Sequence, residues 1–300
     1  MVRREQARLF GVLGEPVEHS LSPAMHNAAF AAAGLPHLYL RYRVPPAQLR
    51  AALDEARTLG MGGLNLTVPL KEVVRPFLDA VTPEAERIGA VNTVLFRGGR
   101  LIGDNTDGRG FARSLRGHVR LRGATAVVIG AGGSARAVGA ALVAGGARRI
   151  VVANRTVPRA EALAARLRAL GTADVRPAPL AALARGDVLA GAALIVNTTS
   201  TGLHGAAVRV RHAATSRACL FVDLVYGARP TPFLAAAARA GRPTLDGAGM
   251  LLHQGALAWE AWNGRPAPLA AMARALADAG LALTRLGTAV TFGVPRPVHA

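Results

Sequence analysis

Lysine occurs once in the chain, at position 71. The other 35 of the 36 basic residues are arginines. Arginine stays protonated in proteins, whereas a buried lysine can approach neutrality and exchange a proton. This usage makes Lys71 a candidate for proton transfer, and chance retention of a single lysine is the alternative.

Hydroxyl, amide and carboxyl side chains stand near the ends of the predicted strands in the first 110 residues. These residues are Ser20, Ser22, Asn65, Thr67, Asn92 and Asp107. Such groups, together with one lysine, suit a polyhydroxylated, anionic small molecule. Each also has a structural explanation, because serine and aspartate cap helices and asparagine can satisfy an edge strand. Their occurrence together favours a small-molecule site.

A glycine-rich segment lies between a continuous apolar strand and an alanine-rich helix. It reads Gly130, Ala131, Gly132, Gly133, Ser134 and Ala135. Glycines allow a tight turn and a close approach of the backbone to a pyrophosphate, which then meets the positive end of the helix. A plain turn is the alternative, but the position after a buried strand predicts a dinucleotide site.

The end of the following strand indicates which dinucleotide is bound. Asn154, Arg155 and Thr156 stand there, Arg159 follows one turn later, and no carboxylate comes before Glu161. An NAD site usually has an acidic residue at this place for the ribose 2′-hydroxyl, whereas a guanidinium group binds a 2′-phosphate. We therefore predict NADP as the cofactor, with Arg155 as the main phosphate partner. A solvated surface role for Arg155 is the alternative.

Alternating strand and helix patterns position these residues. We expect strands at 8–14, 37–44, 63–67, 90–96 and 100–103, and helices at 23–33, 46–59 and 71–80. Ser22 is a candidate N-cap of the first helix, and Gly98 with Gly99 predicts a hairpin. This alternation indicates an α/β unit with a mostly parallel sheet.

A second α/β unit begins near residue 123. We expect strands at 124–129, 148–153, 193–197 and 218–222, with helices from the glycine segment to about 144 and over 158–170. The order fits a Rossmann-like, doubly wound nucleotide-binding domain. Two further helices are predicted at 248–263 and 269–279, and residues 281–300 are interpreted as a loose tail.

Composition excludes several classes of protein. Hydrophobic residues make up 51% and charged residues 18% of the 300, which excludes a disordered chain. No apolar run has the length of a membrane span, and the N-terminus lacks a signal-peptide pattern. The single Cys219 excludes an internal disulfide framework, and the eight histidines show no metal-ligand spacing. We expect a soluble cytoplasmic chain without a metal.

The net charge of +18 could attract nucleic acid. However, aromatic residues make up only 4%, and the arginines are spread along the chain. We interpret the charge as a compositional bias and expect a small-molecule substrate, with neither nucleic acid nor membrane as a partner.

Several segments together resemble the shikimate dehydrogenase family. They are GEPVEHSLSP at 14–23 with His26 and Asn27, NLTVPLK at 65–71, GAVNT at 89–93, GDNTDG at 103–108, the glycine loop at 130–135, NRT at 154–156, residues 197–202, and DG at 246–247 with GMLLHQGA at 249–256. The resemblance runs in order from about residue 9 to 280.

The resemblance implies NADP-linked, reversible reduction of 3-dehydroshikimate to shikimate, a step of chorismate and aromatic amino acid biosynthesis. It implies that Lys71 and Asp107 form the catalytic pair. It further implies substrate contacts from Ser20, Ser22, Asn65, Thr67, Asn92, Tyr226 and Gln254, and cofactor contacts from Thr199, Leu203 and Gly247 in addition to the glycine loop and residues 154–159. Residues 1–107 with 248–280 would then bind the substrate, and 108–247 would bind NADP.

The chain departs from the family pattern at a few positions. Ala228 stands where proline is frequent, and Ser200 and Leu203 replace a common proline and methionine. The tail 281–300 extends past the usual end. A quinate or mixed-specificity dehydrogenase and a catalytically silent NADP-binding regulator remain alternatives, and the chain is expected to be a monomer or a homodimer.

Overall fold

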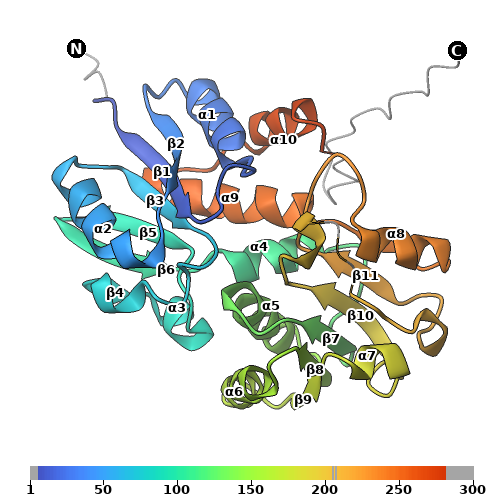
Figure 1. Cartoon of the computed structure of the whole chain (residues 1–300). Helices are drawn as coiled ribbons and strands as arrows, with labels where there is room; N and C mark the ends of the chain where they lie inside the picture. The colour runs from blue at the N-terminus through green and yellow to red at the C-terminus, as the bar shows by residue number, and fades with distance from the viewer. Residues whose placement is uncertain (1–5, 205, 207, 282–300) are drawn as a thin grey trace, which may run out of the picture.

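Two six-stranded sheets, each with helices packed on it, form the two domains of this α/β protein (Figure 1). The computed structural model describes residues 6–204, 206 and 208–281, with no side-chain description at 203 and 204. Helices α4 (Asp107–Ser114) and α9 (Ala248–Asn263) pack against each other at the junction of the domains. The sequence therefore predicted the fold class correctly.

The first sheet is mixed. Its strands, in spatial order, are β2 (Leu38–Arg43), β1 (Leu9–Gly14), β3 (Gly63–Leu66), β5 (Thr93–Arg97), β6 (Arg100–Asp104) and β4 (Ala80–Val81). Strands β2, β1 and β3 are parallel, and β5 and β6 form an antiparallel hairpin. Gly98 and Gly99 form its turn with φ of 56° and 76°, as a two-residue hairpin loop requires.

The second sheet is entirely parallel. Its strands, in spatial order, are β12 (Thr244–Leu245), β11 (Leu220–Asp223), β10 (Ala192–Asn197), β7 (Thr125–Ile129), β8 (Arg149–Asn154) and β9 (Asp174–Pro179). The order reverses between β7 and β10, so the crevice beside the carboxyl end of β7 is the switch point at which such sheets bind nucleotides.

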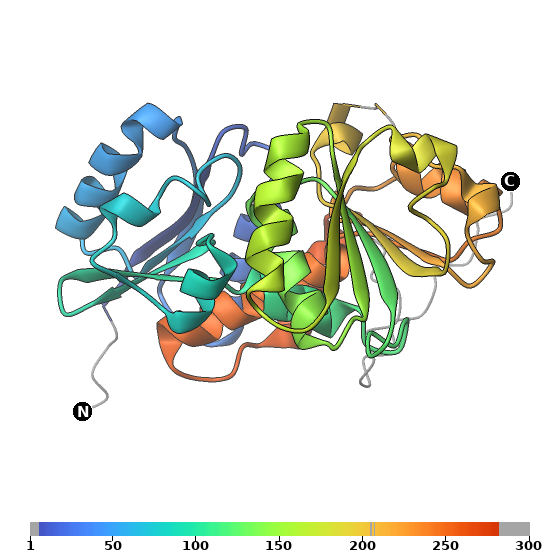
Figure 2. The same ribbon diagram turned by 90° about the horizontal axis from the view of Figure 1, so that it is seen from below.

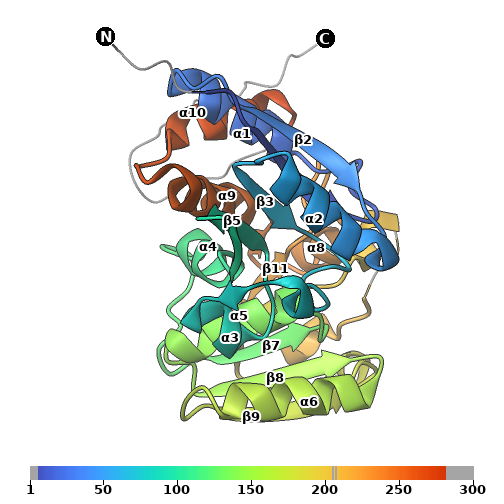
Figure 3. The same ribbon diagram turned by 90° about the vertical axis from the view of Figure 1, so that its left-hand side faces the viewer.

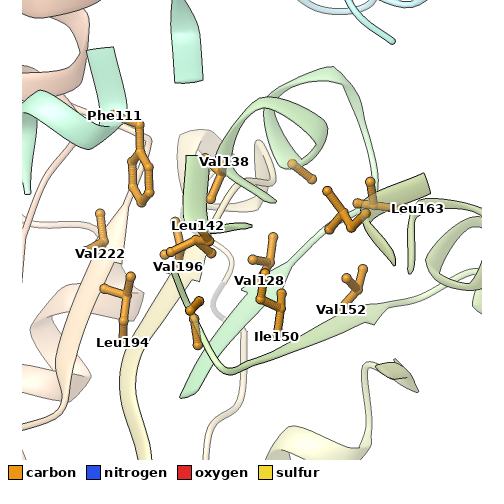
Figure 4. Close-up of a cluster of buried hydrophobic side chains, with 14 of the residues drawn as sticks. Phe111, Val128, Val138, Leu142, Ile150, Val152, Leu163, Leu194, Val196 and Val222 are labelled. Carbon is orange, nitrogen blue, oxygen red and sulfur yellow. The ribbon is translucent and has the colours of Figure 1, made fainter. Parts of the chain in front are cut away.

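Apolar side chains cover both faces of β7. Val128 joins Val138, Ile150 and Val152 in one cluster (Figure 4), whereas the neighbouring Val127 faces a second cluster on the other side of the sheet. A strand buried on both faces has a continuous apolar sequence, which is why this element could be predicted with nearly correct bounds.

Helices cover both sheets. Their bounds are α1 (Ser22–Ala32), α2 (Leu49–Thr58), α3 (Pro83–Ile88), α5 (Gly133–Ala144), α6 (Val157–Arg168), α7 (Ala182–Arg185), α8 (Pro232–Arg239) and α10 (Leu269–Asp278), with short 3-10 turns η1 (Pro46–Gln48), η2 (Arg75–Phe77), η3 (Thr201–His204) and η4 (His212–Ala214). In the view from below, the orange helix α9 runs along the lower edge of the first domain and reaches the junction (Figure 2). Within the described part of the chain, no helix is long and apolar enough to span a membrane.

The C-terminal helices return to the first domain. Helix α10 lies beside α1 (Figure 3), and α9 contributes Trp259 and Trp262 to the cluster that contains Phe10 and Phe30. Both tryptophans are almost fully buried. This packing joins segments that lie more than 200 residues apart in the sequence. Of the predicted tail, all but Leu281 lies outside the described residues.

Two local predictions are wrong. The helix expected at 71–80 is a series of turns, because the Lys71 carbonyl accepts the Val91 N–H at 2.9 Å and Pro76 lies within the segment. Ser22 does not cap α1, because Leu21 occupies the cap position and Ser22 is already the first helical residue. Its hydroxyl is therefore available to the polar interior beside it.

The buried His26 makes the stability of the fold depend on pH. It stacks on Tyr39 with a 4.4 Å centroid distance, and its complete burial lowers its pKa to about 3. Because the unfolded chain takes up this proton below about pH 6.5 and the folded chain does not, the stability present above pH 6.5 is lost as the pH falls toward 3. Burial lowers the pKa of His253 to about 4, which acts in the same direction.

We therefore expect His26→Phe to reduce the loss of unfolding free energy between pH 7 and pH 5 by about 2 kcal/mol. Urea titrations at both pH values measure this difference. The phenyl ring keeps the stacking on Tyr39 and removes the titration. An equal pH dependence in both chains would contradict the assignment.

Candidate active site

A cavity of about 260 Å³ lies where the two domains meet. It is lined by twelve of the residues predicted from the sequence, namely Ser20, Ser22, Asn65, Thr67, Lys71, Asn92, Asp107, Ser134, Thr199, Tyr226, Gly247 and Gln254. These residues come from loops and helices of both domains, from strand β3 and from the returning helix α9. The fold therefore gathers the polar residues that are dispersed over more than 230 positions.

Lys71 and Asp107 form the charged centre of this cavity. The Lys71 Nζ donates to Asp107 Oδ2 at 2.6 Å, and it lies 3.4 Å from the hydroxyl of Ser134 in the glycine loop. The lysine side chain is 12% exposed and the aspartate 4%, so water screens the pair little. Asp107 is the first residue of α4, where the helix dipole favours a carboxylate.

Asn92 binds the other carboxylate oxygen of Asp107. Its Nδ2 donates to Asp107 Oδ1 at 2.8 Å and to Thr106 Oγ1 at 2.9 Å, and it lies 3.3 Å from Gln254 Oε1. Its Oδ1 accepts the Thr106 N–H at 2.8 Å. Asn92 therefore connects the start of α4 with α9, which is more than the edge-strand role considered from the sequence.

Tyr39 was not predicted from the sequence. It is fully buried on β2, and its hydroxyl donates to Asn65 Oδ1 at 2.8 Å. Burial raises the pKa of this phenol well above its ordinary value, so the group stays a donor. Asn65 in turn donates to the Asn92 carbonyl at 3.1 Å. The available signal was weak, because β2 reads LYLRYR and contains a second tyrosine and two arginines beside Tyr39.

Ser20 and Tyr226 meet on the opposite wall. The Tyr226 hydroxyl interacts with the Ser20 side chain and the Leu21 backbone, and burial raises its pKa. Ser20 Oγ accepts the Ser22 N–H at 3.3 Å, and the Ser20 carbonyl accepts from Arg41 Nε at 2.9 Å. Hydroxyl groups and a nearby guanidinium suit an anionic ligand at this wall.

The glycine loop fits a dinucleotide. Gly130 has φ of +111°, which side-chain-bearing residues rarely adopt, and a Cβ there would lie 2.5 Å from Thr198 Oγ1. The loop runs from the end of β7 into the start of α5, a twelve-residue helix whose first N–H groups can face a phosphate. The backbone therefore has the form that a pyrophosphate requires.

The predicted phosphate partners lie on α6 and just before it. Arg155 is exposed, and Arg159 is 56% exposed with its guanidinium 3.3 Å from Glu72 Oε1. Asn154 donates to the Thr156 carbonyl at 2.9 Å, which shapes the turn after β8. Both guanidinium groups are exposed and carry the charge that complements a phosphate, and the partner Glu72 was not predicted from the sequence.

The loops after β10 and before α9 form the remaining wall. Thr199 Oγ1 donates to Asn197 Oδ1 at 2.7 Å, and Asn197 donates to the buried Asp223, whose pKa burial raises. A Cβ at Gly247 would lie 2.0 Å from the Leu224 carbonyl oxygen, so only glycine fits there. The side chain of Leu203, predicted beside the nicotinamide, lies outside the described residues.

Three family models match successive parts of the chain. They are the shikimate dehydrogenase substrate binding domain at 12–94, shikimate/quinate 5-dehydrogenase at 112–227, and the shikimate 5′-dehydrogenase C-terminal domain at 247–277. The shikimate dehydrogenase (NADP(+)) of Symbiobacterium thermophilum is 46% identical over 281 residues, covering 90% of this chain and 93% of the relative. The chain belongs to the shikimate dehydrogenase family.

Solved structures of shikimate dehydrogenase relatives share the fold. The shikimate 5-dehydrogenase of Thermus thermophilus, in complex with NADP(H) and shikimate, is 42% identical with a TM-score of 0.78 and covers 91% of this chain and 99% of that chain. The quinate dehydrogenase of Corynebacterium glutamicum, in complex with NAD, is 33% identical with a TM-score of 0.81 and covers 91% and 100%. Both matches therefore include both domains of this chain.

Within the ranges that the structure covers, no cluster of three or more His, Cys, Asp or Glu side chains is placed to hold a metal ion. The polar cluster of Lys71, Asp107, Asn92 and Thr106 instead consists of one ammonium group, one carboxylate, one amide and one hydroxyl group. These groups bind polar substituents and exchange protons.

Gly110 brings α4 against Gln254. A Cβ at this position would lie 2.7 Å from the backbone nitrogen and the Cβ of Gln254, so an added methyl group must push α9 away. We expect Gly110→Ala to raise KM for the ring substrate about tenfold and to lower stability by about 1–3 kcal/mol, although alanine favours helices. Steady-state kinetics and denaturation measure both.

Gly249→Ala is the matched control on the same helix pair. Its Cβ would approach only the Ser114 side chain, at 3.2 Å, so a much smaller effect on KM is expected. A Gly110→Ala chain with an unchanged KM would show that the position of Gln254 is unimportant for substrate binding.

Proposed function

We propose that the chain reduces 3-dehydroshikimate to shikimate with NADPH, and catalyses the reverse reaction with NADP, in chorismate and aromatic amino acid biosynthesis. The observation that carries this proposal is the Lys71–Asp107 pair at 2.6 Å, placed in the cavity between the glycine loop and the polar wall of the first domain. An ammonium group held by a carboxylate can donate a proton beside a nucleotide site.

In this proposal each of the two domains binds one of the two ligands. Residues 1–107 with 248–280 bind the ring substrate, and residues 108–247 bind NADP through the glycine loop and the arginines after β8. The cavity supports this division, because residues of both segments line it, and Tyr226 reaches from the second segment to Ser20 of the first. We propose that the chain acts in the cytoplasm as a monomer or a homodimer.

The mechanism assigns each residue to one task. When bound, NADPH supplies the hydride for the ring ketone. Lys71 donates the proton that the carbonyl oxygen requires as negative charge develops there, and accepts it in the reverse direction. Asp107 holds the lysine Nζ, and Asn92 holds Asp107 through the 2.8 Å contact to Oδ1.

The substrate carboxylate and hydroxyl groups are bound by the neutral polar residues. Ser20 and Ser22 are proposed to receive the carboxylate, near Tyr226 and Arg41. Asn65, Thr67 and Gln254 also line the cavity and are proposed to bind ring hydroxyls. Neutral hydrogen-bonding groups of this kind select for a polyhydroxylated ring, because an analogue lacking a hydroxyl leaves them unpaired.

Cofactor choice follows from charge. Arg155 lies in the turn after β8 and Arg159 in the first turn of α6, and no carboxylate that would repel a 2′-phosphate precedes Glu161 in this segment. The solved Thermus thermophilus relative in complex with NADP(H) supports the same cofactor. We therefore assign NADP to this chain.

A matrix of initial rates tests the proposed function. Purified chain is supplied with 3-dehydroshikimate or 3-dehydroquinate, each with either NADPH or NADH, and oxidation is followed at the nicotinamide absorbance band. The largest kcat/KM is expected for 3-dehydroshikimate with NADPH. Comparable rates with 3-dehydroquinate would assign mixed specificity, a result suggested by the quinate dehydrogenase relative. Absence of oxidation in every combination would indicate a silent NADP-binding regulator.

A further inference from the structure

The residue after Lys71 reaches across the domain junction. Glu72 Oε2 lies 2.7 Å from the Arg136 guanidinium on α5, and Glu72 Oε1 lies 3.3 Å from the Arg159 guanidinium on α6. Its side chain is 25% exposed, so the carboxylate is partly shielded from water. One carboxylate of the first domain therefore bridges two arginines of the second.

Backbone carbonyls support the same junction. Arg136 also donates to the Gly89 carbonyl at 2.8 Å, and Arg166 donates to the carbonyls of Glu86 and Arg87 at 3.1 Å each. These contacts bind the end of α3 to α5 and α6. The junction therefore persists without the Glu72–Arg159 contact.

The two contacts of Glu72 differ in strength. The contact with Arg136 is short, and the Arg136 side chain is 28% exposed, whereas the contact with Arg159 is long and the Arg159 side chain is 56% exposed. Exposed, long ion pairs contribute little free energy because water and salt screen them. The Glu72–Arg159 contact is thus the weaker of the two and the one that a competing anion would break first.

Arg159 is also a proposed partner of the cofactor phosphate. A 2′-phosphate carries more negative charge than a carboxylate and offers more acceptor oxygens, so it is the stronger partner for a guanidinium group. Glu72 is close enough to Arg159 to neutralise it and to repel an arriving phosphate. The Glu72 carboxylate therefore opposes the binding of the 2′-phosphate to Arg159.

We propose that Glu72 is a specificity-determining residue that competes with the 2′-phosphate of NADP for Arg159 while its contact with Arg136 holds the Lys71 turn against α5. This inference rests on the proposed function, because it assigns Arg159 to the phosphate. On phosphate binding, Arg159 exchanges the Glu72 carboxylate for the phosphate, and the Glu72–Arg136 contact remains. Glu72 thereby reduces the preference for NADP over NAD.

Calorimetric titration with 2′,5′-ADP and with 5′-ADP tests the competition without any turnover. Glu72→Gln keeps an acceptor for Arg136 and removes the charge. We expect it to lower the Kd for 2′,5′-ADP about three- to fivefold, as the loss of a screened ion pair implies, and to leave the Kd for 5′-ADP within about 1.5-fold. In an Arg159→Gln background, the Glu72→Gln effect on 2′,5′-ADP is expected to disappear.

Glu86→Gln is the matched control. It also removes one glutamate charge of the first domain, but that side chain is 53% exposed and pairs with Arg75 of the same domain. No change in either Kd is expected for it. Equal effects of Glu72→Gln and Glu86→Gln, or an effect that persists without Arg159, would overturn the inference.

The outcomes separate this inference from the proposed function. If the wild-type chain binds neither nucleotide, both are overturned. If it binds 2′,5′-ADP more tightly than 5′-ADP but Glu72→Gln changes nothing, only the role of Glu72 is overturned.

Discussion

Replacing Lys71 by alanine is expected to lower kcat for 3-dehydroshikimate reduction by at least about a hundredfold, the usual contribution of a positioned acid. The ammonium group is the donor nearest to Asp107, at 2.6 Å, in a cavity whose other polar groups are mostly neutral. Substrate affinity is expected to change much less, because Ser20, Asn65 and the other hydrogen-bonding groups remain. Steady-state kinetics and a separate measurement of shikimate binding distinguish the two effects.

Lys71→Arg is the sharper variant. It keeps the positive charge beside Asp107 and removes the transferable proton, because a guanidinium does not deprotonate in proteins. We expect kcat to fall in the arginine variant as well as in the alanine variant. A turnover within about threefold of wild type in the alanine variant would show that Lys71 does not transfer the proton.

Asp107→Asn is expected to give the second largest loss, about ten- to a hundredfold in kcat. The asparagine keeps an oxygen that accepts from Asn92 but loses the negative charge that holds Lys71 Nζ. Without this partner the lysine side chain can leave its position above the glycine loop, and the ammonium group loses its counter-charge in a buried site. Steady-state kinetics with both substrates measures the loss.

Asp104→Asn is the control for the aspartate variant. Asp104 is also buried, but its carboxylate accepts from Thr82 and Arg109 and does not line the cavity. Its replacement is expected to affect stability more than kcat. Similar kcat values in the two asparagine variants would contradict a special role for Asp107.

The sequence predicts the central strands and the glycine loop of the nucleotide-binding half well, because their signals are local, whereas β9, α7, α8 and β12 were not predicted. Strand β7 is buried and, after Thr125, apolar, the glycine loop follows it directly, and α5 begins within that loop. In the other domain, helix α9 was also predicted with its observed bounds, 248–263, and Gly264 ends it in the left-handed conformation.

The turns after Lys71 have a local cause, Pro76, which the sequence offered as a signal against a helix, and a second cause that lies in a contact distant in sequence. The Lys71 carbonyl is taken by Val91 N–H, twenty residues away, and Pro76 interrupts any helix that might begin there. The apolar spacing of Leu70, Val74 and Phe77 resembles a helix but reflects packing of the turns on the first domain.

The polar residues of the candidate site were predicted by type and by family resemblance, but their contacts were not. The 2.8 Å contacts from Tyr39 to Asn65 and from Asn92 to Asp107 depend on how β2, β3 and α4 are placed in space. Glu72 gave only a weak signal, one acidic residue next to the single lysine. Its two arginine partners lie 64 and 87 residues away and belong to the other domain.

The most direct measurement is the single-turnover rate of NADPH oxidation when the Lys71→Arg chain, saturated with NADPH, is mixed with saturating 3-dehydroshikimate. If a transferable proton on residue 71 is required, both ligands bind as they do to the wild-type chain and the rate falls by at least about a hundredfold. A rate within about threefold of wild type would contradict the assignment of Lys71 as proton donor.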